Sequence, residues 1–134
     1  MNEPQAKAAR GRILIVDDAP FNLRLLTAML QDDGYEVRQA ISGKFALQVV
    51  PIVKPDLILL DINMPEMDGY EVCRILKRMP EAKDIPVIFI SALDSALDKE
   101  NAFAAGGLDY ITKPFQLKDI LTRVEMQLSQ SHCQ

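Results

Sequence analysis

Reactive side chains stand directly after four apolar or mixed segments of this 134-residue sequence. Asp17 and Asp18 follow the first segment, Asp61 ends the second, Ser91 follows the third and Lys113 follows the fourth. Three carboxylates brought together repel one another, and either a divalent cation or an ammonium group relieves that repulsion. Because the set contains oxygen ligands and neither His nor Cys, it favours a hard ion such as Mg²⁺.

This combination is suited to accepting a phosphoryl group. Asp61 is the candidate nucleophile, since a carboxylate can form a covalent acyl phosphate. Mg²⁺ would neutralise phosphoryl oxygens, and Lys113 and the Ser91 hydroxyl would hold the remaining ones. Phosphoryl transfer depends mainly on positioning and charge neutralisation, which these groups supply.

Each of these residues also has an ordinary structural explanation. A lone Asp61 after a strand is commonly a turn residue, and an Asp17-Asp18 pair is a common helix cap. Lys113 would otherwise be a solvated surface charge, and Ser91 a cap or turn residue. The phosphoryl interpretation therefore depends on whether these residues meet at one edge of one sheet.

The segments that carry them are predicted to be strands of a parallel sheet. Residues 13–16, 57–60 and 87–90 are continuously apolar, which is typical of central strands buried on both faces. Residues 35–40 and 108–112 mix apolar and polar side chains, which indicates edge strands. Strands alternate with helical segments along the chain, and this predicts a single α/β domain with helices on both faces.

The order 2-1-3-4-5 satisfies these constraints. It places the three apolar strands in the centre and the two mixed strands at the edges, as in a flavodoxin-like doubly wound (βα)5 fold. Ligands bind such sheets at the carboxyl ends of the strands, where the direction of winding reverses. That point lies between the first and third strands, so Asp17, Asp18 and Asp61 are predicted to converge there.

Apolar residues recur at helical spacing between the strands. The first helix is predicted over 20–31, with Pro20 in its first turn. Ser42 is predicted to cap the second helix, and Pro51, which has no N–H, to end or kink it early. Further helices are predicted from Asp68 or Gly69 to Met79, from Ser95 to Ala105, and over 117–128.

Composition narrows the class of protein. The formal charge of −4 argues against a nucleic-acid surface, and no apolar run approaches the length that a membrane helix needs. Cys73 and Cys133 are far apart in sequence and are interpreted as free thiols of a cytoplasmic protein. The organisation predicted is a flexible N-terminal tail over 1–11, one domain over 12–128, and a C-terminal tail or linker over 129–134.

Four motifs together resemble those of response-regulator receiver domains of two-component signalling. They are IVDD at 15–18, LDINMPEMDG at 60–69, ISA at 90–92 and DYITKPF at 109–115. Each motif alone is of moderate or weak specificity, and the four in this order are highly specific. The resemblance covers residues 12–128. Its last segment, residues 123–128, is similar to the corresponding segment of receivers in hybrid kinases and cyclase-linked regulators.

The resemblance implies a phosphoacceptor role for Asp61, with a sensor histidine kinase or a histidine phosphotransfer domain as the donor. It implies that Asp18 ligates Mg²⁺ directly, that Asp17 acts through water, and that the Asn63 backbone carbonyl is a further ligand beside Asp61. It also implies that the chain catalyses only its own phosphorylation and dephosphorylation, so it is not a classical enzyme.

A conformational switch is implied in the same way. Ser91 and Tyr110 resemble the switch pair of the family, and Lys113-Pro114 resembles its cis peptide. Phosphorylation would then change the face formed by the fourth helix, the fifth strand and the fifth helix, between Ser91 and Phe115. The effector is unknown, and a phosphorylation-dependent dimer stays open.

Three alternatives remain at this stage. A pseudo-receiver would bind partners without phosphorylation, although the complete set of acidic residues and lysine argues against it. A hydrolase of the haloacid dehalogenase type would need a second Asp two residues after Asp61, where Asn63 stands. Phe21 lies either in the core or on a kinase-docking patch formed by residues 19–22.

Overall fold

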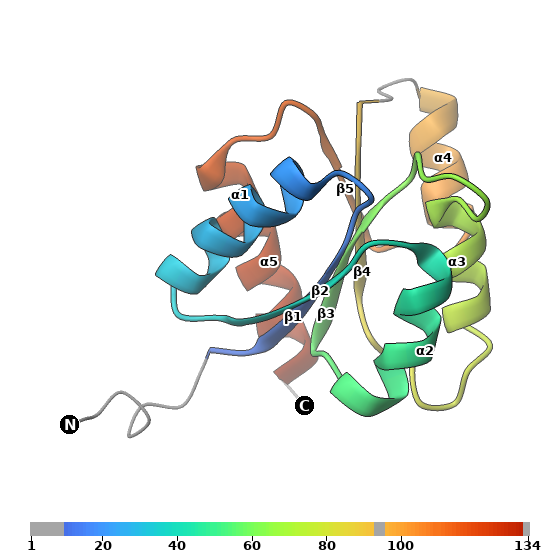
Figure 1. Ribbon diagram of the computed structural model, residues 1–134, viewed down its shortest axis with the longest axis horizontal. Coiled ribbons are helices and arrows are strands. Elements are labelled where there is room, and N and C mark those ends of the chain that lie inside the picture. Colours follow the sequence, from blue (N-terminus) through green and yellow to red (C-terminus); the bar gives the residue numbers. More distant parts are fainter. Residues whose placement is uncertain (1–9, 93–95, 133–134) are drawn as a thin grey trace.

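A five-stranded parallel sheet in the order β2-β1-β3-β4-β5 forms the centre of the computed structural model, which describes residues 10–92 and 96–132 (Figure 1). The predicted fold class and strand order are therefore confirmed. The strands are β1 (Arg12–Val16), β2 (Glu36–Ala40), β3 (Leu57–Asp61), β4 (Val87–Ser91) and β5 (Asp109–Thr112).

Burial separates the central strands from the edges, as their composition predicted. Every residue of β3 and β4 is buried, whereas β2 exposes Arg38 and Gln39 to solvent. The register pairs Val16 with Leu60 and Asp61 with Ile90, so β1, β3 and β4 end close together at one edge. The carboxyl ends of these strands therefore form a common platform for side chains.

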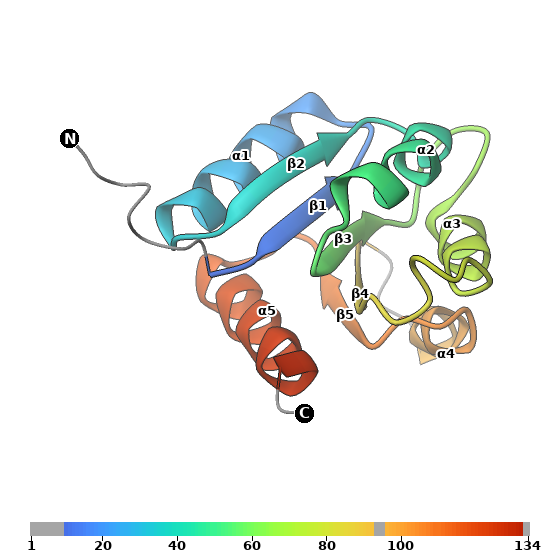
Figure 2. The same cartoon turned by 90° about the horizontal axis from the view of Figure 1, so that it is seen from below.

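Helices cover both faces of the sheet. Figure 2 shows α1 and α5 on one side, and α2, α3 and α4 on the other. The described helices are α1 (Pro20–Asp32), α2 (Gly43–Val53), α3 (Gly69–Leu76), α4 (Ala96–Ala104) and α5 (Leu117–His132).

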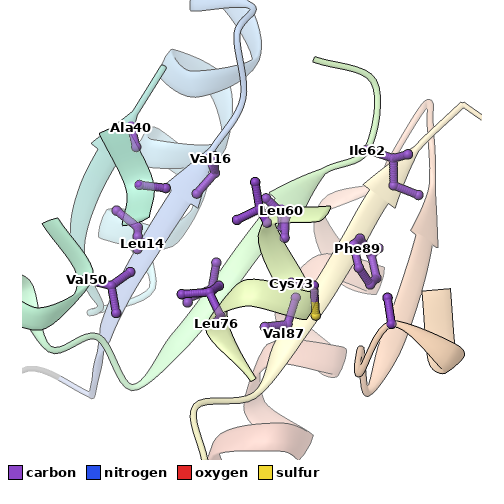
Figure 3. Close-up of a cluster of buried hydrophobic side chains, with 14 of the residues drawn as sticks. Leu14, Val16, Ala40, Val50, Leu60, Ile62, Cys73, Leu76, Val87 and Phe89 are labelled. Atoms are coloured by element: carbon purple, nitrogen blue, oxygen red, sulfur yellow. The ribbon is translucent and has the colours of Figure 1, made fainter. Parts of the chain in front are cut away.

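Strand alternation divides the buried side chains into two cores. Ile13 and Ile15 pack toward α1 and α5, and Leu14 and Val16 pack toward α2, α3 and α4. Figure 3 shows part of the second core, in which residues of three central strands meet side chains of α2 and α3. Each face of the sheet thus has its own hydrophobic cluster.

Helix α2 differs from the prediction at its end. Ser42 accepts a hydrogen bond from the Phe45 N–H at 3.1 Å and caps the helix as predicted. The helix continues past Pro51 to Val53, so of the two predicted effects of Pro51, an end or a kink, the early end was wrong. A proline so near the C-terminus removes one backbone bond only, and other donors serve the last turn. Lys54 N–H donates to the Val50 carbonyl at 2.8 Å, and Arg12 donates to the Val53 carbonyl at 2.6 Å.

The ends of the domain extend further than predicted. Helix α5 runs to His132, so residues 129–132 are helical where a tail was expected. Arg10, also assigned to a tail, forms an ion pair with Asp33 at 2.6 Å and lies 4.8 Å from the Tyr35 ring centre. A charged side chain that gains both an ion pair and a ring contact is held against the domain.

Two predictions fall on residues 93–95 and 133–134, which are outside the described residues. They are the Ser95 cap of the fourth helix and the free Cys133. Cys73 is a buried free thiol in α3, and burial raises its pKa to about 11. Across the described ranges, no helix combines the length and apolar character that crossing a membrane requires.

Candidate functional site

Three carboxylates meet at the carboxyl edge of the central strands. Asp17 and Asp18 follow β1, and Asp61 is the last residue of β3. Each offers a ligand oxygen, and these oxygens all lie within 4.8 Å of one another. Asp17 and Asp61 are buried, whereas Asp18 is exposed. The sequence-predicted acidic cluster is therefore assembled by the fold.

Lys113 completes this cluster from the end of β5. Its Nζ lies 3.1 Å from Asp61 Oδ1 and 3.6 Å from Asp17 Oδ2. The ammonium group is thus shared between two buried carboxylates and lies closer to Asp61. This geometry excludes the alternative in which Lys113 is only a solvated surface charge.

Burial alters the acidity of Asp61. The side chain is 4% exposed, and its pKa is raised from the ordinary 3.8 to about 6, chiefly because burial desolvates the carboxylate. The charge of Asp17 also contributes to this rise, and the hydrogen bond and charge of Lys113 act in the opposite direction. The pKa rises because burial and the second carboxylate together outweigh the lysine. A carboxylate that is costly to ionise is a common feature of functional sites.

The acidic pair does not cap the following helix. The N-cap of α1 is Ala19, which offers no side-chain hydrogen bond, and Pro20 begins the helix. Asp17 instead accepts one hydrogen bond from the Ala19 N–H at 2.9 Å and another from the Asn22 amide at 3.2 Å. The helix-cap explanation of this pair, which the sequence left open, is therefore wrong.

A glycine fixes the main chain at the end of β3. Gly69 N–H donates to the Ile62 carbonyl at 2.9 Å, which seats the start of α3 against the residue after Asp61. A Cβ at Gly69 would lie 2.4 Å from the Asp61 carbonyl oxygen, closer than any side chain can approach. Only glycine permits this contact. The start of α3 thereby packs directly against the main chain of Asp61 and Ile62.

Ser91 and Tyr110 lie in the neighbouring strands β4 and β5. Ser91 is fully buried at the end of β4, and its carbonyl accepts the Lys113 N–H at 2.8 Å. By alternation Ser91 belongs with Phe89, on the side that α3 and α4 cover. Tyr110 is buried in the same cluster and is the register partner of Phe89. The predicted switch pair thus shares one face of the sheet.

Two further predicted site features lie in the loops after β3 and β5. Asn63 is exposed in the loop after β3, two positions beyond Asp61. The peptide bond between Lys113 and Pro114 is cis, as the resemblance implied. The donor set is entirely carboxylate oxygen within 4.8 Å, and this chemistry fits a small hard cation such as Mg²⁺.

Two contacts near the site had no counterpart in the sequence reasoning. The amide of Asn22 reaches Asp17, and the Tyr70 hydroxyl donates to the Asp98 carbonyl at 3.1 Å, joining α3 to α4. The Tyr70 ring also lies 5.6 Å from that of Phe89. The position of Asn22, a polar residue in the first turn after an acidic pair, is a sequence signal from which this contact could have been predicted.

The fold and this cluster define a class: flavodoxin-like domains with an acidic site at the switch point of the sheet. Comparison with known proteins then identifies the family. The chain belongs to the response regulator receiver domain family, whose model matches residues 13–125.

Curated relatives include longer proteins. The chain is 41% identical over 117 residues to the DNA-binding dual master transcriptional regulator RpaA of Synechocystis, covering 87% of this chain and 48% of RpaA. It is 45% identical over 114 residues to the response regulator PleD of Caulobacter vibrioides, covering 85% of this chain and 25% of PleD. The chain therefore spans between a quarter and half the length of these two relatives.

Solved structures extend the likeness to the whole domain. The receiver domain of a histidine kinase from Syntrophus aciditrophicus matches with a TM-score of 0.85 and 36% identity, covering 92% of this chain and 94% of that one. The receiver domain of a sensor histidine kinase from Pseudomonas aeruginosa matches with a TM-score of 0.84 and 30% identity, covering 91% and 99%. The Pseudomonas structure has a magnesium ion in its active-site cleft.

Proposed function

We propose that this receiver domain is a phosphoacceptor switch that takes a phosphoryl group onto Asp61 from a phosphohistidine. The donor is a sensor histidine kinase or a histidine phosphotransfer protein. The observation that carries the proposal is a buried Asp61 carboxylate 3.1 Å from the Lys113 ammonium, with two further carboxylates within 4.8 Å. This arrangement combines a nucleophile with the charges that phosphoryl transfer requires.

In the proposed reaction, an Asp61 oxygen attacks phosphorus. The bond between phosphorus and the donor histidine nitrogen breaks, and its electron pair stays on the imidazole. Lys113 holds a phosphoryl oxygen, since its ammonium already lies against Asp61. Bound Mg²⁺, held by Asp18, Asp61 and the Asn63 carbonyl with Asp17 beside it, would supply charge neutralisation for the other oxygens. Attack of water on the acyl phosphate later restores Asp61 and releases phosphate.

Mass spectrometry tests the proposed function directly. Incubating the chain with Mg²⁺ and a small acyl phosphate should add the mass of one phosphoryl group, and adding a chelator should prevent the gain. A chain that stays unmodified with both the small donor and a phosphorylated histidine phosphotransfer domain would support the pseudo-receiver alternative.

A groove beside the site is proposed as the docking surface of the phosphodonor. Phe21 is 64% exposed, so the core alternative for this residue is excluded. With Leu25 and Phe115 it borders a groove of about 380 Å³ that also reaches Lys113. An apolar surface next to a reactive carboxylate suits a protein donor, which must bring its phosphohistidine to Asp61.

We expect Phe21→Ser to slow transfer from a phosphorylated histidine phosphotransfer domain by roughly tenfold, since it removes one exposed aromatic anchor from the docking surface. Labelling by a small acyl phosphate should stay unchanged, because that donor needs no docking surface. Rates are compared by phosphoprotein gel electrophoresis, with Phe45→Ser on α2 as the matched control. Equal slowing with both donors would contradict the docking role.

The switch is proposed to involve Ser91 and Tyr110. A phosphoryl group on Asp61 adds charge and strong hydrogen-bond acceptors, toward which the Ser91 hydroxyl can move. Tyr110 combines an apolar ring with a polar tip, so it tolerates both buried and exposed positions. In α4 the buried residue is Ala102, and a helix anchored by so small a side chain shifts readily. The output surface would then be α4, β5 and α5.

Hydrogen exchange followed by mass spectrometry measures this change. Phosphorylated and unphosphorylated chains should differ in exchange mostly between Ser91 and Phe115. The reason is that Ser91 and Tyr110, the two side chains proposed to move, lie in the neighbouring strands β4 and β5. The Asp61→Asn variant under phosphorylating conditions is the control. Differences confined to α1 and α2 would refute the switch.

A further inference from the structure

Asp17 is held by two N–H donors rather than by the lysine alone. Its Oδ1 accepts from the Ala19 backbone at 2.9 Å, and its Oδ2 accepts from the Asn22 side-chain amide at 3.2 Å. We infer that Asn22 is a positioning residue of the site, which orients Asp17 and thereby keeps Lys113 on Asp61. This inference rests on the proposed function and assigns a role to a residue that does not touch the reacting atoms.

The distances show that Lys113 lies between Asp17 and Asp61 and is closer to Asp61. Its Nζ lies 3.6 Å from Asp17 Oδ2 and 3.1 Å from Asp61 Oδ1. The Asn22 amide donates to the same Oδ2 that faces the ammonium. Because this oxygen already accepts a hydrogen bond, Asp17 competes less strongly for the lysine. The ammonium stays where it can hold a phosphoryl oxygen on Asp61.

Burial makes the amide hard to replace. Asp17 is 2% exposed, so solvent cannot readily supply a substitute donor if the amide is removed. A buried carboxylate that loses a hydrogen bond turns to its remaining partners. Among the described residues, the charged group next to Asp17 Oδ2 is the Lys113 ammonium. Removing the amide should therefore draw Lys113 toward Asp17 and away from Asp61.

The hydrogen bond from Asn22 to Asp17 should also affect the binding of Mg²⁺. Side chains that hydrogen-bond to groups around a metal fix the orientation of those groups, and their loss commonly weakens metal binding. Asp17 belongs to the oxygen cluster that fits Mg²⁺, and Asn22 fixes its rotamer from the first turn of α1. A half-buried residue in this place adds little to either core, so its effect on the site can be separated from an effect on folding.

A simpler role for Asn22 makes a different prediction. Asn22 also borders the groove formed with Phe21 and Leu25, where it could serve only as a contact for the phosphodonor. In that case its removal would change transfer from a protein donor and would leave Mg²⁺ affinity unchanged. The metal-binding measurement therefore separates the two roles.

The test measures Mg²⁺ affinity by isothermal titration calorimetry on the metal-free full chain. Asn22→Ala is expected to weaken binding roughly tenfold, and Asn22→Gln, which keeps the amide, to recover most of that loss. Arg24→Ala, exposed on the same helix, should stay within about twofold of the unchanged chain. Labelling by a small acyl phosphate at saturating Mg²⁺ should also slow in Asn22→Ala, since Lys113 is displaced.

Two results would overturn the inference. One is an unchanged Mg²⁺ affinity in Asn22→Ala, and the other is an equal loss in Asn22→Ala and Asn22→Gln, which would show that the amide is not the cause. A cooperative melting transition in each variant verifies that it is folded. If the unchanged chain accepts no phosphoryl group, the proposed function fails, and the Mg²⁺ affinities still decide the role of Asn22.

Discussion

An Asp61→Asn chain incubated with Mg²⁺ and a small acyl phosphate is expected to show no phosphoryl mass gain at all. The amide that replaces the carboxylate is not nucleophilic, although it keeps nearly the same shape. Asp17 is hydrogen-bonded to Ala19 and Asn22, and Asp18 is exposed, so neither neighbour reproduces the position of Asp61 against Lys113. The loss should therefore be complete rather than partial.

The measurement is intact-mass spectrometry at neutral pH. Asp32→Asn is the matched control, because it removes an exposed carboxylate at the far end of α1 and should leave the mass gain unchanged. Labelling of Asp61→Asn at the stoichiometry of the unchanged chain would show that another residue is the acceptor.

The same substitution is expected to stabilise the metal-free fold. Asp61 has a pKa of about 6 in the folded chain against an ordinary 3.8, so ionising it opposes folding. A difference of this size corresponds to roughly 2–3 kcal/mol at pH 7. Removing the charge should recover most of that free energy and raise the melting temperature by on the order of 8 °C. Functional sites commonly hold such a destabilised cluster.

The stability gained by Asp61→Asn should depend on pH, because the charge on Asp61 does. Between about pH 4 and pH 6 the folded chain binds more protons at Asp61 than the unfolded chain does. The stability of the unchanged chain should therefore fall as the pH rises through that range, and the cost is fully present above about pH 6. The advantage of Asp61→Asn should be largest at pH 7 and should vanish near pH 4.

Thermal melts in the presence of a chelator measure both trends. Asp18→Asn should also melt higher than the unchanged chain, but by less, because Asp18 is exposed and water already screens its charge. Excess Mg²⁺ should narrow the difference between the unchanged chain and Asp61→Asn. If Asp18→Asn melts lower without metal and binds Mg²⁺ normally, repulsion within the cluster is not what strains the site.

The architecture could be predicted because strand composition is a direct consequence of burial. A parallel strand covered on both faces has no position for a polar side chain, so 57–60 and 87–90 had to be central. The polar residues of 35–40 required an edge. The order 2-1-3-4-5 agrees with three central strands and two edges, and it predicts that Asp17 and Asp61 meet at the switch point.

Other features depend on contacts that no local pattern encodes. The length of α2 past Pro51 depends on Arg12, a residue of β1 that donates to the Val53 carbonyl. The hydrogen bond from Asn22 to Asp17 depends on the angle at which α1 leaves β1. Spacing along the sequence shows which residues are neighbours in the chain, and these contacts are set by packing between elements.

Helices α1 and α4 cover opposite faces of the sheet, and this has a consequence for complexes of the domain. The proposed donor groove lies beside α1 with Phe21, whereas Leu97 and Phe103 are exposed on α4, across the sheet. A donor in this groove leaves α4 uncovered. A target that binds α4 then need not compete with the donor, so binding of the target before the donor departs is sterically allowed.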